Sequence, residues 1–240
     1  MDQHGQHRAL VKPWAALAGI ALALMPGPAL ACRLALALAV DISTSIDSRE
    51  YALQRDGLAA ALTAPEVVSA FLGHPQPVAL AVYEWSGQRQ QQLIIDWTLI
   101  DNEAAMFGVA AQISRQERTV TGYPTSLGHA LRFGAELMRS APSCWQHTLD
   151  VSGDGRNNDG YPPAVAFRHF EFSKMTINGL AIGGAEEIDS LVTYFRNHVI
   201  HGPGAFVEIA DDHYDFERAM RQKLEREVAT RAVSRLDIDP

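Results

Sequence analysis

Three oxygen-bearing side chains alternate where an apolar run ends near the start of the chain. The run LALALAV at positions 34–40 is followed by Asp41, Ser43 and Ser45. Alternate positions of an extended segment face the same side, so these side chains can converge on one point. Carboxylate and hydroxyl oxygens suit Mg²⁺, Mn²⁺ or Ca²⁺ rather than Zn²⁺ or Cu²⁺. The stretch therefore predicts a hard-cation site, unless the serines merely cap a helix that starts near Asp47.

Two further loops carry oxygen side chains at comparable places. Thr125 lies in GYPTSLG, which leads into a predicted helix, and Asp154 lies in SGDG, which closes a predicted strand. Ligands of open α/β sheets bind beside the carboxyl ends of the strands. The candidate metal ligands are therefore Asp41, Ser43, Ser45, Thr125 and Asp154. Two carboxylates would roughly neutralise a divalent ion and leave a position open for water or a partner's oxygen.

Apolar strand-like segments alternate with helical segments along the rest of the chain. Strands are predicted at 33–41, 78–85, 92–98, 146–152, 176–182 and 205–210, and helices at 47–63, 65–72, 101–116 (capped by Asp101), 126–139, 162–172, 188–198 and 214–231. This alternation indicates one α/β domain with a mostly parallel sheet and helices on both faces. The polar turn between 78–85 and 92–98 predicts an antiparallel hairpin.

The charge and the first residues bear on partners and location. The formal net charge is −8 and there is no basic run, which disfavours nucleic acid and anionic membrane surfaces as partners. Arg8 and Lys12 precede an apolar run over 14–25 and an Ala-Leu-Ala sequence at 29–31, which together are typical of a secretory signal peptide. We expect a signal peptide over 1–31, an exported domain over 32–231 and a C-terminal tail over 232–240.

The order and spacing of the metal-site motifs resemble the metal-ion-dependent adhesion site (MIDAS) of the von Willebrand factor A-type (VWA) domain. The resemblance extends over roughly 32–227. It implies a Rossmann-like, doubly wound α/β fold, with a six-stranded sheet in the order 3-2-1-4-5-6 and one antiparallel edge strand. It also implies that Ser43, Ser45 and Thr125 coordinate the metal and that Asp41 and Asp154 bind it directly or through water. In this family a Glu or Asp of a protein partner often completes the metal shell.

Two longer stretches, EYALQRDGLAAAL at 50–62 and DVSGDGRNN at 150–158, resemble a bacterial, exported VWA-like family of unknown function. That resemblance implies a periplasmic or secreted protein. One stretch departs from the VWA pattern, because Tyr-Pro-Thr stands at 123–125 where many members have Gly-Gly-Thr. Pro124 restricts the backbone before the ligand. Ser126 therefore stays open as an alternative ligand to Thr125.

The implied strand order also bears on the two cysteines. Cys32 precedes Asp41, and Cys144 precedes Asp154, by nearly the same number of residues. If the two strands are parallel neighbours, both cysteines lie at the opposite edge of the sheet, where a disulfide is feasible in an oxidising compartment. The alternative is a lipid anchor on Cys32, because Ala-Leu-Ala-Cys at 29–32 loosely resembles a bacterial lipobox.

The sequence contains none of the common hydrolase or dinucleotide-binding motifs, neither H-E-x-x-H nor G-x-S-x-G nor a complete G-x-G-x-x-G. We therefore expect a binding module, not an enzyme, which uses Mg²⁺, or else Mn²⁺ or Ca²⁺, to engage an acidic group of a protein partner. Two alternatives stay open. One is a metal-dependent hydrolase that uses the same site, and the other is a scaffold domain whose site has decayed.

Overall fold

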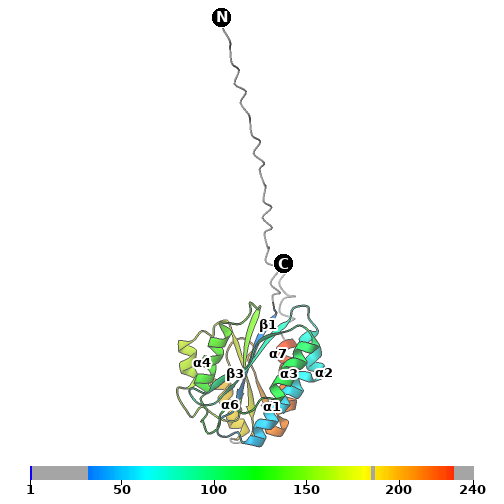
Figure 1. Cartoon of the computed structure of the whole chain (residues 1–240). Coiled ribbons are helices and arrows are strands. Elements are labelled where there is room, and N and C mark those ends of the chain that lie inside the picture. Colours follow the sequence, from blue (N-terminus) through cyan, green and yellow to red (C-terminus); the bar gives the residue numbers. More distant parts are fainter. Residues whose placement is uncertain (2–31, 185–186, 230–240) are drawn as a thin grey trace, which may run out of the picture.

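The alternating apolar segments fold as a six-stranded sheet with helices on both faces (Figure 1). This computed structural model describes Met1 and residues 32–184 and 187–229. Apart from Met1, the predicted signal peptide and the tail from 232 lie outside the described residues. The elements are β1 (Leu34–Asp41), α1 (Ser48–Thr63), α2 (Pro65–Leu72), β2 (Val78–Trp85), β3 (Gln91–Ile100), α3 (Glu103–Ser114), α4 (Leu127–Met138), β4 (Gln146–Gly153), α5 (Pro163–His169), β5 (Thr176–Ile182), α6 (Ile188–His198), β6 (Val207–Ala210), the 3-10 turn η1 (His213–Asp215) and α7 (Phe216–Ala229).

The strand order is β3-β2-β1-β4-β5-β6, which confirms the predicted VWA-like topology. β1 lies between β2 and β4 and runs parallel to both. The only antiparallel pair within the described sheet is β2 with β3, so the predicted hairpin forms one edge of the sheet. A strand in the middle of such a sheet is buried on both faces, and every residue of β1 is buried.

The side chains of β1 divide the core into two layers. The even-numbered residues from Leu34 to Val40 belong to the core beneath α1, α2, α3 and α7, whereas the alanines at 35, 37 and 39 belong to the core beneath α4, α5 and α6. The small alanines leave room for the larger Tyr83 and Leu149 of the flanking strands. α4 also packs closely, because a Cβ on Gly134 would lie 2.6 Å from Leu149 Cδ2.

Most element boundaries lie within two residues of the prediction, and the differences have local causes. α3 begins later than predicted, because the side chain of Asn102, and not that of Asp101, accepts a hydrogen bond from Ala105 N (2.9 Å). The predicted helix over 162–172 is wrong at its end, because Phe170 is already extended. The predicted end of the last helix, at 231, lies outside the described residues.

Cys32 and Cys144 form a disulfide at the amino ends of β1 and β4, with 4.5 Å between their Cα atoms. The predicted pairing is therefore confirmed, and the alternative of a lipid anchor on Cys32 is wrong because this thiol is consumed in the bridge. Trp145 N donates to Cys32 O (3.0 Å), which ties the two segments together beside the bridge. The disulfide lies at the opposite end of these strands from Asp41 and Asp154.

A buried charged cluster fixes α7 to the sheet, and no sequence motif predicts it. Lys223 is fully buried, and its Nζ lies 2.9 Å from Asp150 Oδ1 and 2.8 Å from Glu227 Oε1. Asn178 Nδ2 donates to the same Glu227 oxygen (2.9 Å). Burial, opposed by Lys223, raises the pKa of Asp150 to about 7. We call Asp150, Lys223 and Glu227 the buried triad.

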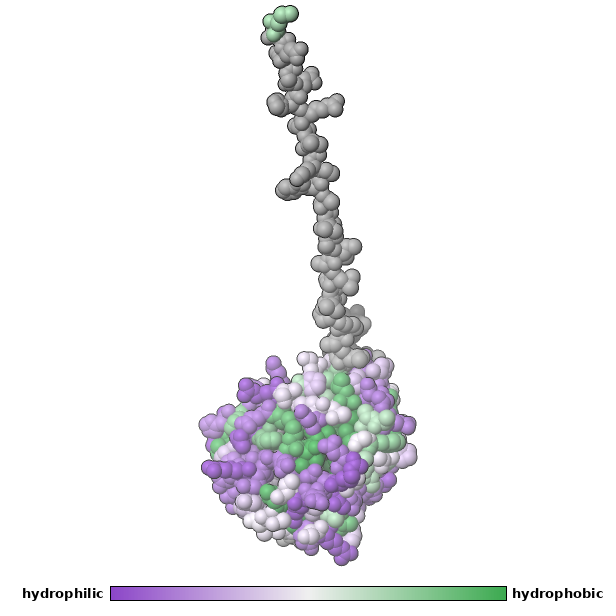
Figure 2. Space-filling view, in the orientation of Figure 1, coloured by the Kyte–Doolittle hydropathy of each residue, from purple (hydrophilic) through white to green (hydrophobic). Residues whose placement is uncertain are grey.

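The edge strand β3 carries exposed apolar residues. Figure 2 shows a hydrophobic area in the middle of the view, where Figure 1 places β3, and Leu93 and Leu99 are exposed on this strand. The edge is irregular, because the register with β2 shifts near Val82 and Asp96 Oδ1 accepts a bond from Trp97 N (2.8 Å). Such irregularity limits pairing with other strands.

Within the described part of the chain, no helix has the length and apolarity that a bilayer span requires.

Candidate metal centre

The candidate ligands meet where the strand order reverses. β1 is flanked by β2 and β4, and the chain leaves β1 and β4 toward opposite sides of the sheet, which opens a crevice at their carboxyl ends. Asp41 is the last residue of β1, and Asp154 directly follows β4. Ser43 and Ser45 lie in the loop between β1 and α1, and Thr125 precedes α4.

The five side chains form one continuous cluster of oxygen atoms. Ser45 Oγ donates to Asp154 Oδ1 (2.7 Å), and Ser45 Oγ lies 3.2 Å from Ser43 Oγ. Thr125 Oγ1 donates to Ser43 Oγ (3.2 Å). Asp41 Oδ1 accepts a bond from the backbone N–H of Ser43 (2.7 Å), which turns the chain at the end of the strand. The fold thus brings together all five residues that the motif spacing singled out.

Both carboxylates are buried, at 0% exposure for Asp41 and 1% for Asp154. The Oδ2 atom of each has no hydrogen-bond partner among the described residues. Burial and the nearby charge of Asp154 raise the pKa of Asp41 well above its ordinary value, and burial also raises the pKa of Asp154 against the opposing bond from Ser45. Unpaired buried carboxylate oxygens are unfavourable unless a cation or donor compensates them. The oxygens therefore fit a hard divalent cation.

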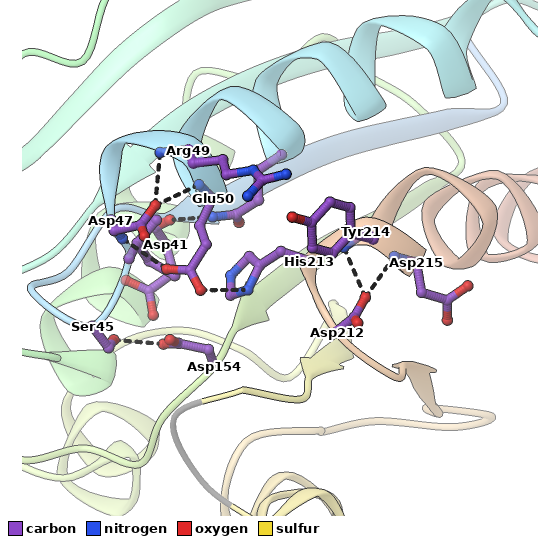
Figure 3. Close-up of polar contacts among 12 residues, drawn as sticks. Asp41, Ser45, Asp47, Arg49, Glu50, Asp154, Asp212, His213, Tyr214 and Asp215 are labelled. Carbon is purple, nitrogen blue, oxygen red and sulfur yellow. Dashed lines mark hydrogen bonds and ion pairs between the residues drawn. The ribbon is translucent and has the colours of Figure 1, made fainter.

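The helix cap beside the cluster is made by Asp47 and not by a serine (Figure 3). Asp47 Oδ1 accepts bonds from Arg49 N (2.7 Å) and Glu50 N (2.8 Å), and Glu50 Oε2 accepts one from Asp47 N (2.8 Å). This reciprocal arrangement is a capping box. The alternative that Ser43 or Ser45 caps α1 is therefore wrong, and both hydroxyls remain available to the oxygen cluster.

The loop that carries Thr125 is fastened to the loop that follows β4. Thr125 N donates to Asn158 Oδ1 (2.9 Å), and the N–H groups of Asn158 and Asp159 donate to Thr125 O (2.9 and 3.1 Å). Ser126 Oγ instead donates to Asp159 O (3.0 Å) and lies 2.8 Å from His129 Nδ1. The structure therefore brings Thr125, rather than Ser126, into the oxygen cluster.

Arg118 holds the loop that carries Ser43 and Ser45, a role that no sequence motif indicates. Its guanidinium donates to the carbonyl oxygens of Ile46 (2.7 Å), Ile42 (2.8 Å) and Ser43 (3.0 Å), and Nε donates to Val120 O (3.1 Å). One side chain thus satisfies several backbone acceptors of a loop that has no regular structure. Arg118 is a positioning residue for the cluster, since none of these bonds reaches a carboxylate.

Replacing Arg118 by Met is expected to loosen this loop. The variant loses charge-assisted bonds to three backbone carbonyl groups of this loop, and each such bond contributes about 1.5–3 kcal/mol. Amide hydrogen exchange over residues 42–46 should therefore become at least about tenfold faster. The matched control is Arg115→Met, because Arg115 is exposed at the end of α3. Unchanged exchange in the Arg118 variant would contradict the positioning role.

Glu50 and His213 form a polar contact beside the cluster (Figure 3). Glu50 Oε1 lies 3.4 Å from His213 Nδ1, and His213 is buried at the start of η1.

In the part of the chain that the structure describes, no three His, Cys, Asp or Glu side chains gather as a metal-binding group. The candidate centre thus has only two carboxylates and depends on hydroxyl groups and water for the remaining ligands, which is typical of Mg²⁺.

Comparison with known proteins identifies the fold. A family described as protein of unknown function (DUF1194) matches residues 31–232, and no curated protein matches the chain. Among solved structures, proximal thread matrix protein 1 (PTMP1) from the mussel byssus is 14% identical with a TM-score of 0.60, over 83% of this chain and 48% of that one. The chain thus spans about half the length of this relative.

Two bacterial structures are similar to the same extent. A von Willebrand factor type A structure from Catenulispora acidiphila is 16% identical (TM-score 0.57) over 82% of this chain and 43% of that one. The PilB minor pilin from Streptococcus sanguinis is 12% identical (TM-score 0.60) over 85% and 63%. Another PTMP1 structure has a zinc-occupied MIDAS motif (14% identity, TM-score 0.53, over 83% and 46%). Together with the strand order, these likenesses establish a VWA-like fold.

Proposed function

The chain belongs to the DUF1194 family of proteins of unknown function, and we propose that it is an exported VWA-like binding module whose metal site engages an acidic group of a protein partner. The proposed ligands are Asp41, Ser43, Ser45, Thr125 and Asp154. The proposed ion is Mg²⁺, or else Mn²⁺ or Ca²⁺, because every donor of the cluster is an oxygen atom.

One observation carries this proposal. Asp41 Oδ2 and Asp154 Oδ2 are both buried without a hydrogen-bond partner, in a cluster that also holds three hydroxyl groups. Protein interiors rarely leave two carboxylate oxygens unpaired, and such groups call for an explanation such as a missing ion. A purely structural role would be served better by apolar side chains of similar volume.

The carboxylates and the hydroxyl groups of the proposed site then have distinct roles. Asp41 and Asp154 supply the negative charge that attracts a cation, and the hydroxyl groups of Ser43, Ser45 and Thr125 complete an oxygen shell around it. A bound Mg²⁺-type ion would supply a fixed positive charge with a coordination position open to a carboxylate. The hydrogen bonds that fasten both loops hold the oxygens in place before a partner arrives, which lowers the entropic cost of binding.

The relatives support a divalent cation at this site and a role in protein interactions. The mussel thread protein has a zinc-occupied MIDAS motif, and PilB is a minor pilin. Export is supported by the signal-like sequence over 1–31 and by the disulfide, because disulfides persist in oxidising compartments. A periplasmic or secreted location is the proposed one.

Replacing Asp41 by Ala is expected to abolish divalent-cation binding. Loss of a group that merely supports a metal ligand weakens affinity by about 10–100-fold, so the loss of a carboxylate ligand should weaken it by about 100-fold or more. Calorimetric titration of wild type and variant with Mg²⁺, Mn²⁺ and Ca²⁺ measures this.

The matched control is Asp101→Ala. Asp101 is exposed beyond the end of β3, beside the start of β2, and therefore lies at the other end of the strands from the candidate metal centre. The proposal fails if the wild-type protein binds none of the three ions or if the Asp41 variant binds them equally well. Capture of a partner from the exporting cell, with and without EDTA, tests the second half of the proposal: a partner retained equally by the Asp41 variant would overturn it.

A further inference from the structure

A second hollow opens beside the candidate metal centre, between α4, α5 and the turn that joins β2 to β3. Its volume is about 570 Å³. The side chains that matter for its chemistry are Arg89, His129, Arg132, Tyr161, His169 and Phe170. We call this hollow the cationic groove.

The charge of the groove is opposite to that of the protein. The chain has a formal net charge of −8, yet no Asp or Glu lines the groove. Arg89 and His169 are exposed, and their side chains have no hydrogen-bond or ion-pair partner among the described residues. Arg132 forms an ion pair with Glu136 (2.8 Å), one helical turn away, which fixes its guanidinium and offsets part of its charge, so Arg89 carries the unpaired positive charge of the groove. Positive groups fixed in a concave surface favour an anionic ligand.

The wall of the groove is rigid and aromatic. The His129 and Tyr161 rings pack against each other with their centroids 4.0 Å apart and their planes tilted by 36°. A side chain at Gly128 would collide with the backbone of Tyr161, so α4 and the start of α5 are in direct contact. Gln88 Nε2 donates to Asp159 Oδ1 (2.9 Å), which fastens the β2–β3 turn to the loop after β4. The groove is therefore formed before any ligand binds.

The groove continues directly from the metal-site loop. Ser126, which follows Thr125, contacts His129 Nδ1 (2.8 Å), and Arg132 lies one further turn along α4. A helix rises 1.5 Å per residue, so the groove extends roughly 5–10 Å beyond the start of α4. An extended peptide advances about 3.3 Å per residue and would cover this distance with roughly two to three residues.

We propose that the cationic groove binds an acidic segment of the same protein partner, roughly two to three residues from the carboxylate that meets the metal. This inference rests on the proposed function of the metal site. The continuity of the two surfaces favours one partner over two independent ligands. Phe170 and the paired rings of His129 and Tyr161 give the groove apolar surface. This surface favours a peptide, which can carry apolar side chains between its charges, over inorganic anions.

The test uses a fluorescein-labelled hexaglutamate peptide as the probe, with binding followed by fluorescence anisotropy. The double variant Arg89→Gln/Arg132→Gln should weaken binding roughly tenfold, since two exposed ion pairs are lost. Its affinity for Mg²⁺ should stay unchanged, because neither arginine belongs to the metal centre. The control Arg139→Gln, an exposed residue at the end of α4, should bind within about twofold of wild type.

A parallel titration in EDTA separates this inference from the proposed function. Hexaglutamate binding should be weaker without divalent ions, and the double variant should weaken it further. If wild type binds no divalent ion but the double variant still loses hexaglutamate affinity, the metal proposal fails and the groove assignment holds. Equal binding by wild type and double variant overturns the groove assignment, as does tighter binding of inorganic phosphate or a sulfated polysaccharide than of hexaglutamate.

Discussion

Replacing Lys223 by Met is expected to lower the free energy of unfolding by about 3–5 kcal/mol. Lys223 is the only cation of the buried triad, and its Nζ lies within 2.9 Å of oxygens of both Asp150 and Glu227. Met has a similar length but no charge, so the variant leaves two carboxylates unpaired in the interior. Urea unfolding followed by circular dichroism measures the loss.

The loss should be larger at pH 8 than at pH 6. The pKa of Asp150 is raised to about 7, so this group is increasingly protonated below that pH, and a neutral carboxyl needs no cation.

Lys174→Met, an exposed substitution, should change stability by less than about 0.5 kcal/mol. Adding Asp150→Asn and Glu227→Gln to the Lys223 variant should recover most of the lost free energy of unfolding, because no unpaired carboxylate then remains. A Lys223 variant as stable as wild type at pH 8 would show that the triad does not hold α7 to the sheet.

Removing the Cys32–Cys144 bridge is expected to cost about 4–5 kcal/mol of stability. The bridge joins residues 112 positions apart, and closing so long a loop removes much of the entropy of the unfolded chain. The double variant Cys32→Ala/Cys144→Ala should therefore unfold at a markedly lower urea concentration than the oxidised wild type.

Reduction of the wild type supplies the internal control for this comparison. A reductant should shift the wild-type midpoint down to that of the double variant and leave the double variant itself unchanged. Identical midpoints for oxidised and reduced wild type would mean that the bridge contributes nothing. Intact-mass measurement of the exported protein checks the pairing directly, because the bridge lowers the mass by two hydrogens.

The fold class follows from local patterns in the sequence. A short segment such as LALALAV, apolar at every position, is typical of a strand that is covered on both faces, and the alternation of such segments with helical ones favours a mostly parallel α/β sheet. The strand order was predicted from the resemblance to VWA domains and is confirmed. The same resemblance singled out all five residues of the oxygen cluster, because each of them lies at the end of a strand or in a loop that follows a strand or precedes a helix.

Choices between neighbouring residues were settled only in three dimensions. The sequence allowed Ser126 in place of Thr125, and a serine in place of Asp47 as the cap of α1. The hydrogen bonds of Ser126 to the loop after β4 and the capping box of Asp47 decide both questions. Such choices depend on the direction in which a side chain points, which motif spacing does not fix.

The order of strands and helices along the chain, and their ends to within about two residues in most cases, therefore follow from the sequence alone, since hydrophobic periodicity and turn-forming residues act over a few positions. Only the tertiary structure placed Arg118 against the loop that carries Ser43 and Lys223 against Asp150, and only it assembled the cationic groove. These contacts join residues more than 70 positions apart in the first two cases, and no local pattern records them. They form because packing the helices against both faces of the sheet brings distant charges to buried carbonyl and carboxylate oxygens that must be satisfied.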